Sequence, residues 1–77
     1  MIAIIDSGGA NIASVQFALE RLGARSVLTS DAAEIAAADR VLLPGVGAAP
    51  VAMKALSDAQ LIEPIRQLRQ PVLGICL

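Results

Sequence analysis

Four short runs of apolar residues stand out along the chain, and turn-forming or polar residues bound each of them. They are "IAII" (2–5), "ARSVLT" (24–29), "VLL" (41–43) and "VLGIC" (72–76). Continuous apolar runs of this length are typical of strands buried on both faces. The second run is the weakest, because charged and hydroxyl side chains interrupt it. The pattern therefore predicts four strands, the last opened by Pro71.

Between the first two runs, apolar residues recur at helical spacing. Ile12, Val15, Leu19 and Leu22 follow one another at steps of three, four and three, which predicts one face of a helix. Gly23 is placed to end this helix. Phe17, the only aromatic residue, lies off the stripe.

Two further helical stretches separate the later strands. "SDAAEIAAAD" (30–39) reads as a short helix, in which Asp31 as N-cap and Glu34 would form a capping box. "LIEPIRQLR" (61–69) follows a helical segment around residues 52–56 and places Leu61, Ile65 and Leu68 on one face. Pro64 either lies near the start of that helix or kinks it, and the pattern leaves both open.

Strands and helices thus alternate with short loops, which predicts an α/β fold. We expect a mostly parallel, flavodoxin-like sheet with right-handed crossovers and flanking helices on both faces, incomplete within these residues. Ligands of such sheets bind beyond the carboxyl ends of the strands. Three unusual stretches, "DSGGAN", "PGVG" and "GICL", all follow strands there. Their convergence predicts a site.

Composition removes several classes of function. The 77 residues carry a net charge of −1 with no basic stripe, so nucleic-acid binding is not expected. With no histidine and one cysteine, the chain offers no ordinary zinc site and no internal disulfide. No metal or cofactor is expected. The chain has no membrane-length apolar run and no signal peptide at its start, so we expect a cytoplasmic protein without membrane contact.

Each of the three stretches has two interpretations. Gly74 and Cys76 match the first half of a G-x-C-x-G nucleophile elbow, in which the small residue leaves room for the turn; a buried core cysteine is the alternative. "PGVG" could direct backbone N–H groups at an oxyanion, or form a plain turn. For "DSGGAN" we favour a tight turn capped by Asn11 over a phosphate cradle.

Taken together, "IIDSGGANIASV", "DRVLLPGVGAAPVAM" and "QPVLGICL" resemble the first part of a class I glutamine amidotransferase domain. Within that family the chain is most similar to the glutaminase subunits of imidazole glycerol phosphate synthase. Relatives serving other acceptors typically carry P-G-G where this chain has "PGVG". The resemblance covers essentially all residues, so we expect 1–77 to be the N-terminal portion of a single amidotransferase domain that ends at the nucleophile elbow.

The resemblance implies an activity and a set of residues. Members of the family hydrolyse glutamine to glutamate and ammonia, and a (β/α)8 cyclase partner uses the ammonia to make imidazole glycerol phosphate in histidine biosynthesis. By position, Cys76 matches the nucleophile, and the backbone N–H groups of Leu77 and Val46 match the oxyanion hole. Gly45 and Gly47 would line the glutamine pocket. Asn11 is an interface candidate only.

The resemblance also implies a histidine and a glutamate downstream of the elbow, and this sequence has no histidine. We therefore expect the 77-residue polypeptide to be inactive alone and to fold weakly, as part of a longer protein. Two alternatives remain open. One is a non-catalytic flavodoxin-like binding or interaction module, and the other is a class I glutaminase domain of another pathway.

Overall fold

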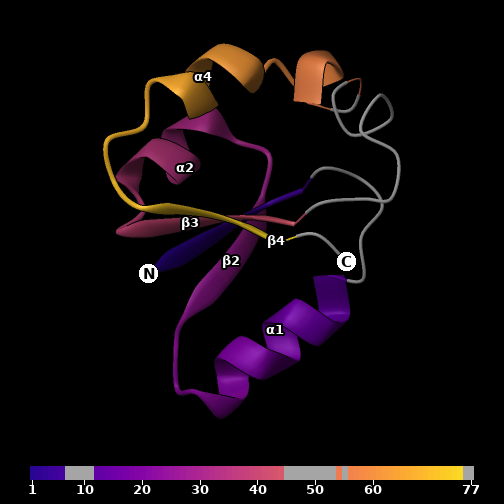
Figure 1. Ribbon diagram of the computed structural model, residues 1–77, viewed down its shortest axis with the longest axis vertical. Helices are drawn as coiled ribbons and strands as arrows, with labels where there is room; N and C mark the ends of the chain where they lie inside the picture. The colour runs from indigo at the N-terminus through magenta and orange to yellow at the C-terminus, as the bar shows by residue number, and fades with distance from the viewer. Residues whose placement is uncertain (7–11, 45–53, 55, 76–77) are drawn as a thin grey trace.

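The computed structural model describes residues 1–6, 12–44, 54 and 56–75, and its elements alternate along the chain (Figure 1). Residue 54 and residues 56–58 are also helical. The named elements are β1 (Ile2–Ile5), α1 (Ile12–Arg21), β2 (Ser26–Thr29), α2 (Ala32–Ala37), β3 (Arg40–Pro44), α4 (Ile62–Arg66) and β4 (Val72–Ile75). No helix in this described part is long and apolar enough to cross a membrane.

The four strands form one sheet in the order β2-β1-β3-β4, and all three pairings are parallel. Parallel neighbours need a crossover between them, which the intervening helices provide. Figure 1 shows α2 and α4 on one face of the sheet and α1 on the other. The predicted α/β fold, with a parallel sheet and helices on both faces, is confirmed.

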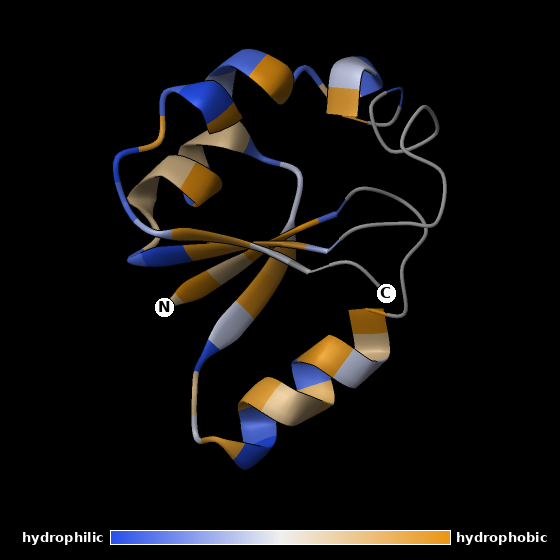
Figure 2. Cartoon of the chain, in the orientation of Figure 1, coloured by the Kyte–Doolittle hydropathy of each residue, from blue (hydrophilic) through white to orange (hydrophobic). Residues whose placement is uncertain are grey.

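The main core lies between the sheet and the α2–α4 layer. Hydrophobic residues fill β1 and the middle of β2 and β3, whereas they alternate with polar ones on the helices (Figure 2). On the sheet, Ala3, Ile5 and Val41 are buried against this layer, and Ile35 and Leu61 meet them from the helical side. Burying a branched aliphatic side chain of this size contributes about 1.5–3 kcal/mol, so this contact stabilises the described chain substantially.

The opposite face of the sheet is covered only in its middle. The pairing register places Leu28, Ile4, Leu42 and Leu73 in one row across the four strands. Ile4 and Leu42 in the centre are buried, whereas Leu28 and Leu73 at the two ends are 37% and 59% exposed. One helix, α1, is therefore too narrow to cover four strands.

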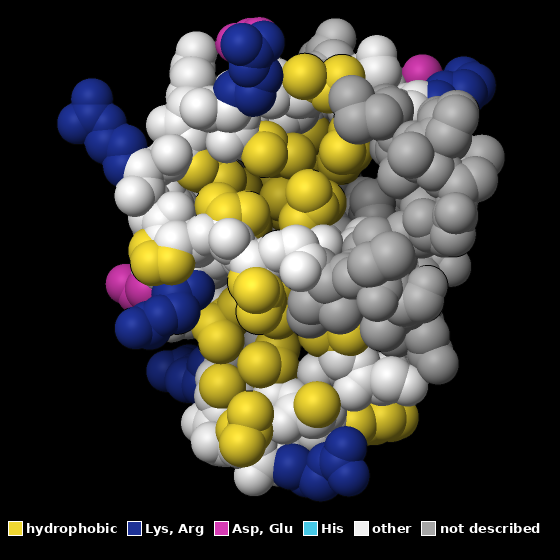
Figure 3. Space-filling view, in the orientation of Figure 1, with side chains coloured by type: hydrophobic (Ala, Val, Ile, Leu, Met, Phe, Trp, Pro, Cys, Tyr) yellow, Lys and Arg dark blue, Asp and Glu magenta, His cyan; other side chains and the backbone are white. Residues whose placement is uncertain are grey.

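A groove of about 300 Å³ follows from this partial cover. Its walls are apolar and come from both the helix and the sheet; they include Ile2, Leu19, Leu42 and Leu73. The space-filling view shows hydrophobic side chains exposed between α1 and the sheet (Figure 3). That these residues fold weakly alone stays a prediction.

The end of α1 is set by hydrogen bonds around Gly23. The N–H of Gly23 donates to the carbonyl of Glu20, and the N–H of Ala24 donates to the carbonyl of Leu19, both at 2.9 Å. This pair of bonds is the Schellman arrangement, which needs a left-handed residue at the position of Gly23. The φ of Gly23 is +73°. The predicted role of this glycine is confirmed.

One residue of the predicted helical stripe falls outside it. Leu22 lies just beyond the last residue of α1, Arg21, and is 80% exposed. Leu22 directly precedes Gly23 in the Schellman turn that ends the helix, so the prediction that it belongs to the helical stripe is wrong. Phe17 lies off the stripe as expected and is also exposed.

The alternatives left open for Pro64 are resolved. Pro64 is the third residue of α4, after Ile62 and Glu63, so its missing N–H falls in the first turn, where no intrahelical partner exists. Pro64 therefore lies near the start of the helix and does not kink it. Leu61, Ile65 and Leu68 face the core as predicted.

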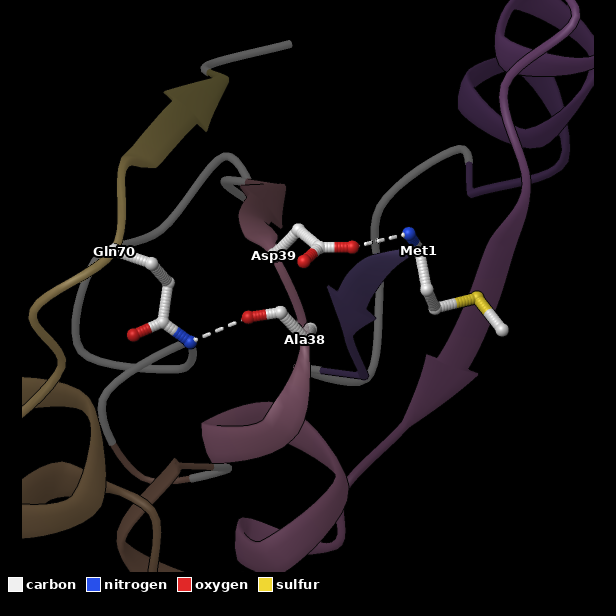
Figure 4. Close-up of polar contacts among 4 residues, drawn as sticks. All are labelled: Met1, Ala38, Asp39 and Gln70. Carbon is white, nitrogen blue, oxygen red and sulfur yellow. Dashed lines mark hydrogen bonds and ion pairs between the residues drawn. The ribbon is translucent and has the colours of Figure 1, made fainter.

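At the amino edge of the sheet, the chain terminus is held by an ion pair. The Met1 ammonium group donates to Asp39 Oδ2 at 2.7 Å (Figure 4). The N–H of Asp39 donates in turn to the carbonyl of Met1 at 3.0 Å. The hydrogen bond from the ammonium group, followed by its positive charge, lowers the pKa of Asp39 below its ordinary value. These contacts join the start of β1 to the approach to β3.

We predict opposite effects for alanine at the two glycines of the described chain. A Cβ at Gly23 or at Gly74 would meet no atom within 4 Å, but only Gly23 has a positive φ. Gly23→Ala should lower the free energy of unfolding by about 1–2 kcal/mol, the cost of a left-handed non-glycine residue. Gly74→Ala should leave it unchanged or raise it by up to about 1 kcal/mol. Denaturant titration of both variants measures the difference, and equal losses would contradict it.

We predict that Asp39 contributes pH-dependent stability. Because the folded state lowers the pKa of Asp39, the stabilisation is present above the ordinary aspartate pKa and is lost as the pH falls through the lowered one. Asp39→Asn should therefore be less stable than the parent at neutral pH and equal to it in strong acid. Urea midpoints across that range test this, with Asp58→Asn as an exposed control. A difference that persists in acid would refute the electrostatic cause.

Candidate functional site

The ends of β1, β3 and β4 lie at one level along the carboxyl edge of the sheet (Figure 1). Pro44 and Ile75 are paired in the β3–β4 register. Asp6 and Pro44 each lie two residues beyond the pair Ile4–Leu42, which joins β1 to β3. The three stretches that the sequence singled out continue directly from these positions. The expected convergence of their starting points is therefore present in the sheet.

The site residues themselves lie outside the described part of the chain. This applies to the predicted nucleophile, the predicted oxyanion and glutamine contacts, and the interface candidate: Cys76, Leu77, Gly45, Val46, Gly47 and Asn11. The structure defines instead the residues from which each segment departs. Their assignments remain predictions.

Gly74 is the one predicted elbow residue within the described part. It belongs to β4, pairs with Leu43 and has open space where a Cβ would stand. Its backbone takes no left-handed conformation, since Gly23 is the positive-φ glycine of the described residues. The strand itself therefore does not require glycine here. The proposed need for a small residue rests on the turn that follows.

Beside these three strand ends, the end of β2 carries a compact polar network. The Thr29 hydroxyl donates to Glu34 Oε1 at 2.6 Å and accepts from the N–H of Asp31 at 3.0 Å. The N–H of Ala33 donates to Asp31 Oδ1 at 3.0 Å, and the N–H of Asp6 donates to the carbonyl of Thr29 at 2.9 Å. Thr29 is the buried polar residue of the described core. The network thus joins the carboxyl edge of the sheet to the start of α2.

This network corrects one sequence prediction. Asp31 caps α2 as expected, but Glu34 does not bond the N–H of Asp31 directly, as a capping box requires. The Thr29 hydroxyl stands between them and relays the contact. Sequence reasoning missed Thr29, although a threonine at a strand end two residues before an N-cap is a usable signal. Its hydroxyl is already bonded on both sides, which leaves Thr29 a structural role.

Comparison with known proteins identifies relatives of the chain. It is 58% identical over 76 residues to the imidazole glycerol phosphate synthase subunit HisH of Idiomarina loihiensis, a match that covers 99% of this chain and 39% of that protein. The HisH subunits of Xanthomonas axonopodis pv. citri and Shewanella oneidensis are each 57% identical over 76 residues, covering 38% and 34% of those proteins. No protein-family model matches. The chain thus spans less than two fifths of these relatives, and the resemblance drawn from the motifs is confirmed for their N-terminal portion.

We predict that the Thr29 hydroxyl stabilises the carboxyl edge. Thr29→Val keeps the shape of the side chain but leaves the Glu34 carboxylate and the N–H of Asp31 without this partner. Loss of such bonds at a part-buried position should cost about 1–3 kcal/mol of unfolding free energy. Thr29→Ser should recover most of it, and Ser30→Ala serves as the exposed control. Denaturant titration in which Thr29→Val matched Ser30→Ala would contradict the assignment.

Proposed function

We propose, from its kinship with the N-terminal portion of HisH subunits, that this chain contributes the nucleophile half of a glutaminase active site. In this proposal residues 1–77 form the first part of one amidotransferase domain, and Cys76 begins the nucleophile elbow. The complete subunit hydrolyses glutamine to glutamate and ammonia. The ammonia passes to a (β/α)8 cyclase subunit, the partner in a heterodimer that makes imidazole glycerol phosphate.

The observation that supports the proposal most directly is the pairing of Pro44 with Ile75. Each of these residues immediately precedes a segment with a proposed catalytic role: Gly45 to Gly47 after β3, and Cys76 with Leu77 after β4. Each segment begins one residue after this pair, about 3.8 Å further along its strand, so the two segments start from neighbouring positions. A thiol nucleophile and N–H donors for its oxyanion need such proximity.

The proposed chemistry follows from these residue types. The Cys76 thiolate attacks the side-chain amide carbon of glutamine, and the N–H groups of Val46 and Leu77 stabilise the oxyanion that forms. One such donor contributes on the order of 3 kcal/mol to a transition state. The C–N bond then breaks, the leaving –NH2 group takes up the proton that the thiol gave up and departs as ammonia, and a thioester remains. Water hydrolyses the thioester to glutamate and restores the thiol.

The thiol needs a partner that these residues do not supply. An ordinary cysteine has a pKa of about 8.5, so only a few per cent is thiolate at neutral pH. The 77 residues contain no histidine to act as base. The proposal therefore assigns the base, and the glutamate that orients it, to a more distant part of the longer subunit. The proposed setting is the cytoplasm, where reducing conditions keep a lone thiol free.

We predict that Cys76 is the site of covalent chemistry in the full-length protein. A glutamine-analogue electrophile should label Cys76, as read by peptide mass spectrometry, and Cys76→Ala should abolish labelling. Because the nucleophile is lost, glutamate release should fall by on the order of 10⁴-fold or more. The 77-residue polypeptide alone should release no more glutamate than this variant.

Two results would overturn the proposal. The first is unchanged glutamate release by a folded full-length Cys76→Ala protein. The second is a folded full-length parent that neither hydrolyses glutamine nor reacts with the analogue, which would favour the non-catalytic binding module. Activity of the heterodimer with ammonia in place of glutamine serves as the control, because it bypasses the thiol.

A further inference from the structure

The side-chain amide of Gln70 joins two segments that are far apart along the described chain. Its Nε2 donates to the carbonyl of Ala38 at 3.0 Å (Figure 4). The same nitrogen donates to the carbonyl of Ile35 at 3.0 Å and lies 3.3 Å from the carbonyl of Ala36. These carbonyls belong to the last turn and C-cap of α2. The final carbonyls of a helix generally lack partners within it, although the carbonyl of Ile35 also accepts from the N–H of Ala38 at 3.2 Å. The amide of Gln70 therefore caps α2 from a distant part of the chain.

The way in which α2 ends explains why an outside donor is used. The C-cap residue, Ala38, has an extended conformation with φ −72° and ψ 151°, and the last turn holds no basic residue. Unlike α1, this helix has no left-handed glycine to close its end. Gln70 supplies the missing donor, and in doing so it fixes the chain just before β4 to the end of α2.

The next residue makes a second anchor. The carbonyl of Pro71 accepts from the N–H of Val41 at 3.0 Å, which begins the ladder between β3 and β4. Ala38, the acceptor of Gln70, lies three residues before Val41 on the same stretch of chain. Gln70 and Pro71 thus attach the start of β4 to the stretch of chain that runs from the end of α2 into β3. Together the two contacts define where β4 starts relative to β3.

The described side chains of β4 contribute little to that register. In the described sheet β4 pairs with β3. Among its described side chains, Val72 and Leu73 are 42% and 59% exposed, and Gly74 has no side chain. Register is weakly specified where strand residues are not buried. Within the described residues, the hydrogen bonds at the start of β4 therefore contribute to its register.

We propose that Gln70 is a positioning residue for Cys76, which it places by fixing the register of β4 through the α2 C-terminus. The proposal rests on the proposed function of Cys76. A slip of one residue would move the end of β4 by about 3.3 Å relative to Pro44 and exchange the faces of its side chains. Misplacement of a nucleophile by about 1 Å can cost 10²-fold in rate.

The test uses the full-length protein and four variants at Gln70. Gln70→Met and Gln70→Glu keep similar length but cannot donate, and Gln70→Asn has an amide one methylene shorter. Gln70→Lys restores a donor that suits a helix C-terminus. Gln67→Met, at an exposed position of the same stretch, is the matched control. The measured quantities are the maximal rate of Cys76 labelling by the glutamine analogue and the analogue concentration at half-saturation.

We expect Gln70→Met and Gln70→Glu to lower the maximal labelling rate at least tenfold, with half-saturation changed less than threefold. Gln70→Lys and Gln67→Met should stay within threefold of the parent. Circular dichroism establishes that each variant is folded at the assay temperature. Should Gln70→Met not fold, Gln70→Asn decides: a tenfold lower rate supports the proposal, and the parental rate overturns it.

Two other results overturn the positioning role. A variant with a lower melting temperature but the parental labelling rate would show that Gln70 only stabilises the fold. Failure of Gln70→Lys alongside Gln70→Met would show that donation to α2 is not what matters. If the parent itself is not labelled at Cys76, the proposed function fails, and the positioning role fails with it. Labelling of the parent protein thus distinguishes failure of the proposed function from failure of the positioning role alone.

Discussion

Hydrogen bonds on both edges of β1 hold the described structure together. β2 pairs with one edge and β3 with the other, and Ala3, Ile4 and Ile5 are fully buried between the helical layers. A strand in this position cannot shift without breaking two ladders and two packed faces together. The end of β1 also lies at the carboxyl edge of the sheet. The polar network of β2 lies at the same edge, and the segments after β3 and β4 begin there.

Strands, helix caps and helix ends could be predicted from the sequence wherever a few neighbouring residues determine them. The apolar runs placed the strands, Asp31 was recognisable as a cap, and Gly23 marked the end of α1, because each of these depends on a few neighbouring residues. Pro64 could not be placed, since the pattern did not show whether the helix began before or after it. Leu22 was misplaced because the apolar pattern continued one residue past Arg21, the last residue of α1.

Contacts between distant residues were not readable. Gln70 lies more than thirty residues from the helix it caps, and nothing in its own neighbourhood indicates a capping role. The strand order also escaped the pattern, because alternation predicts parallel strands without saying which are neighbours. For the candidate site, sequence predicted that three stretches share an edge, and the register shows that their starting points do. The catalytic roles of Gly45 to Gly47 and Cys76 rest on the motifs and the relatives.

The central place of β1 has a consequence for how the chain acquires its structure during synthesis. Of the described strands β1 is synthesised first, and its partners, beginning at Ser26 and Arg40, are made later. Parallel strands cannot pair through a hairpin, so no sheet hydrogen bond can form until the first crossover is complete. Sheets built from such non-local pairs fold slowly and expose apolar segments meanwhile. The apolar side chains of β1, the most hydrophobic described strand, therefore stay exposed to solvent longest during synthesis.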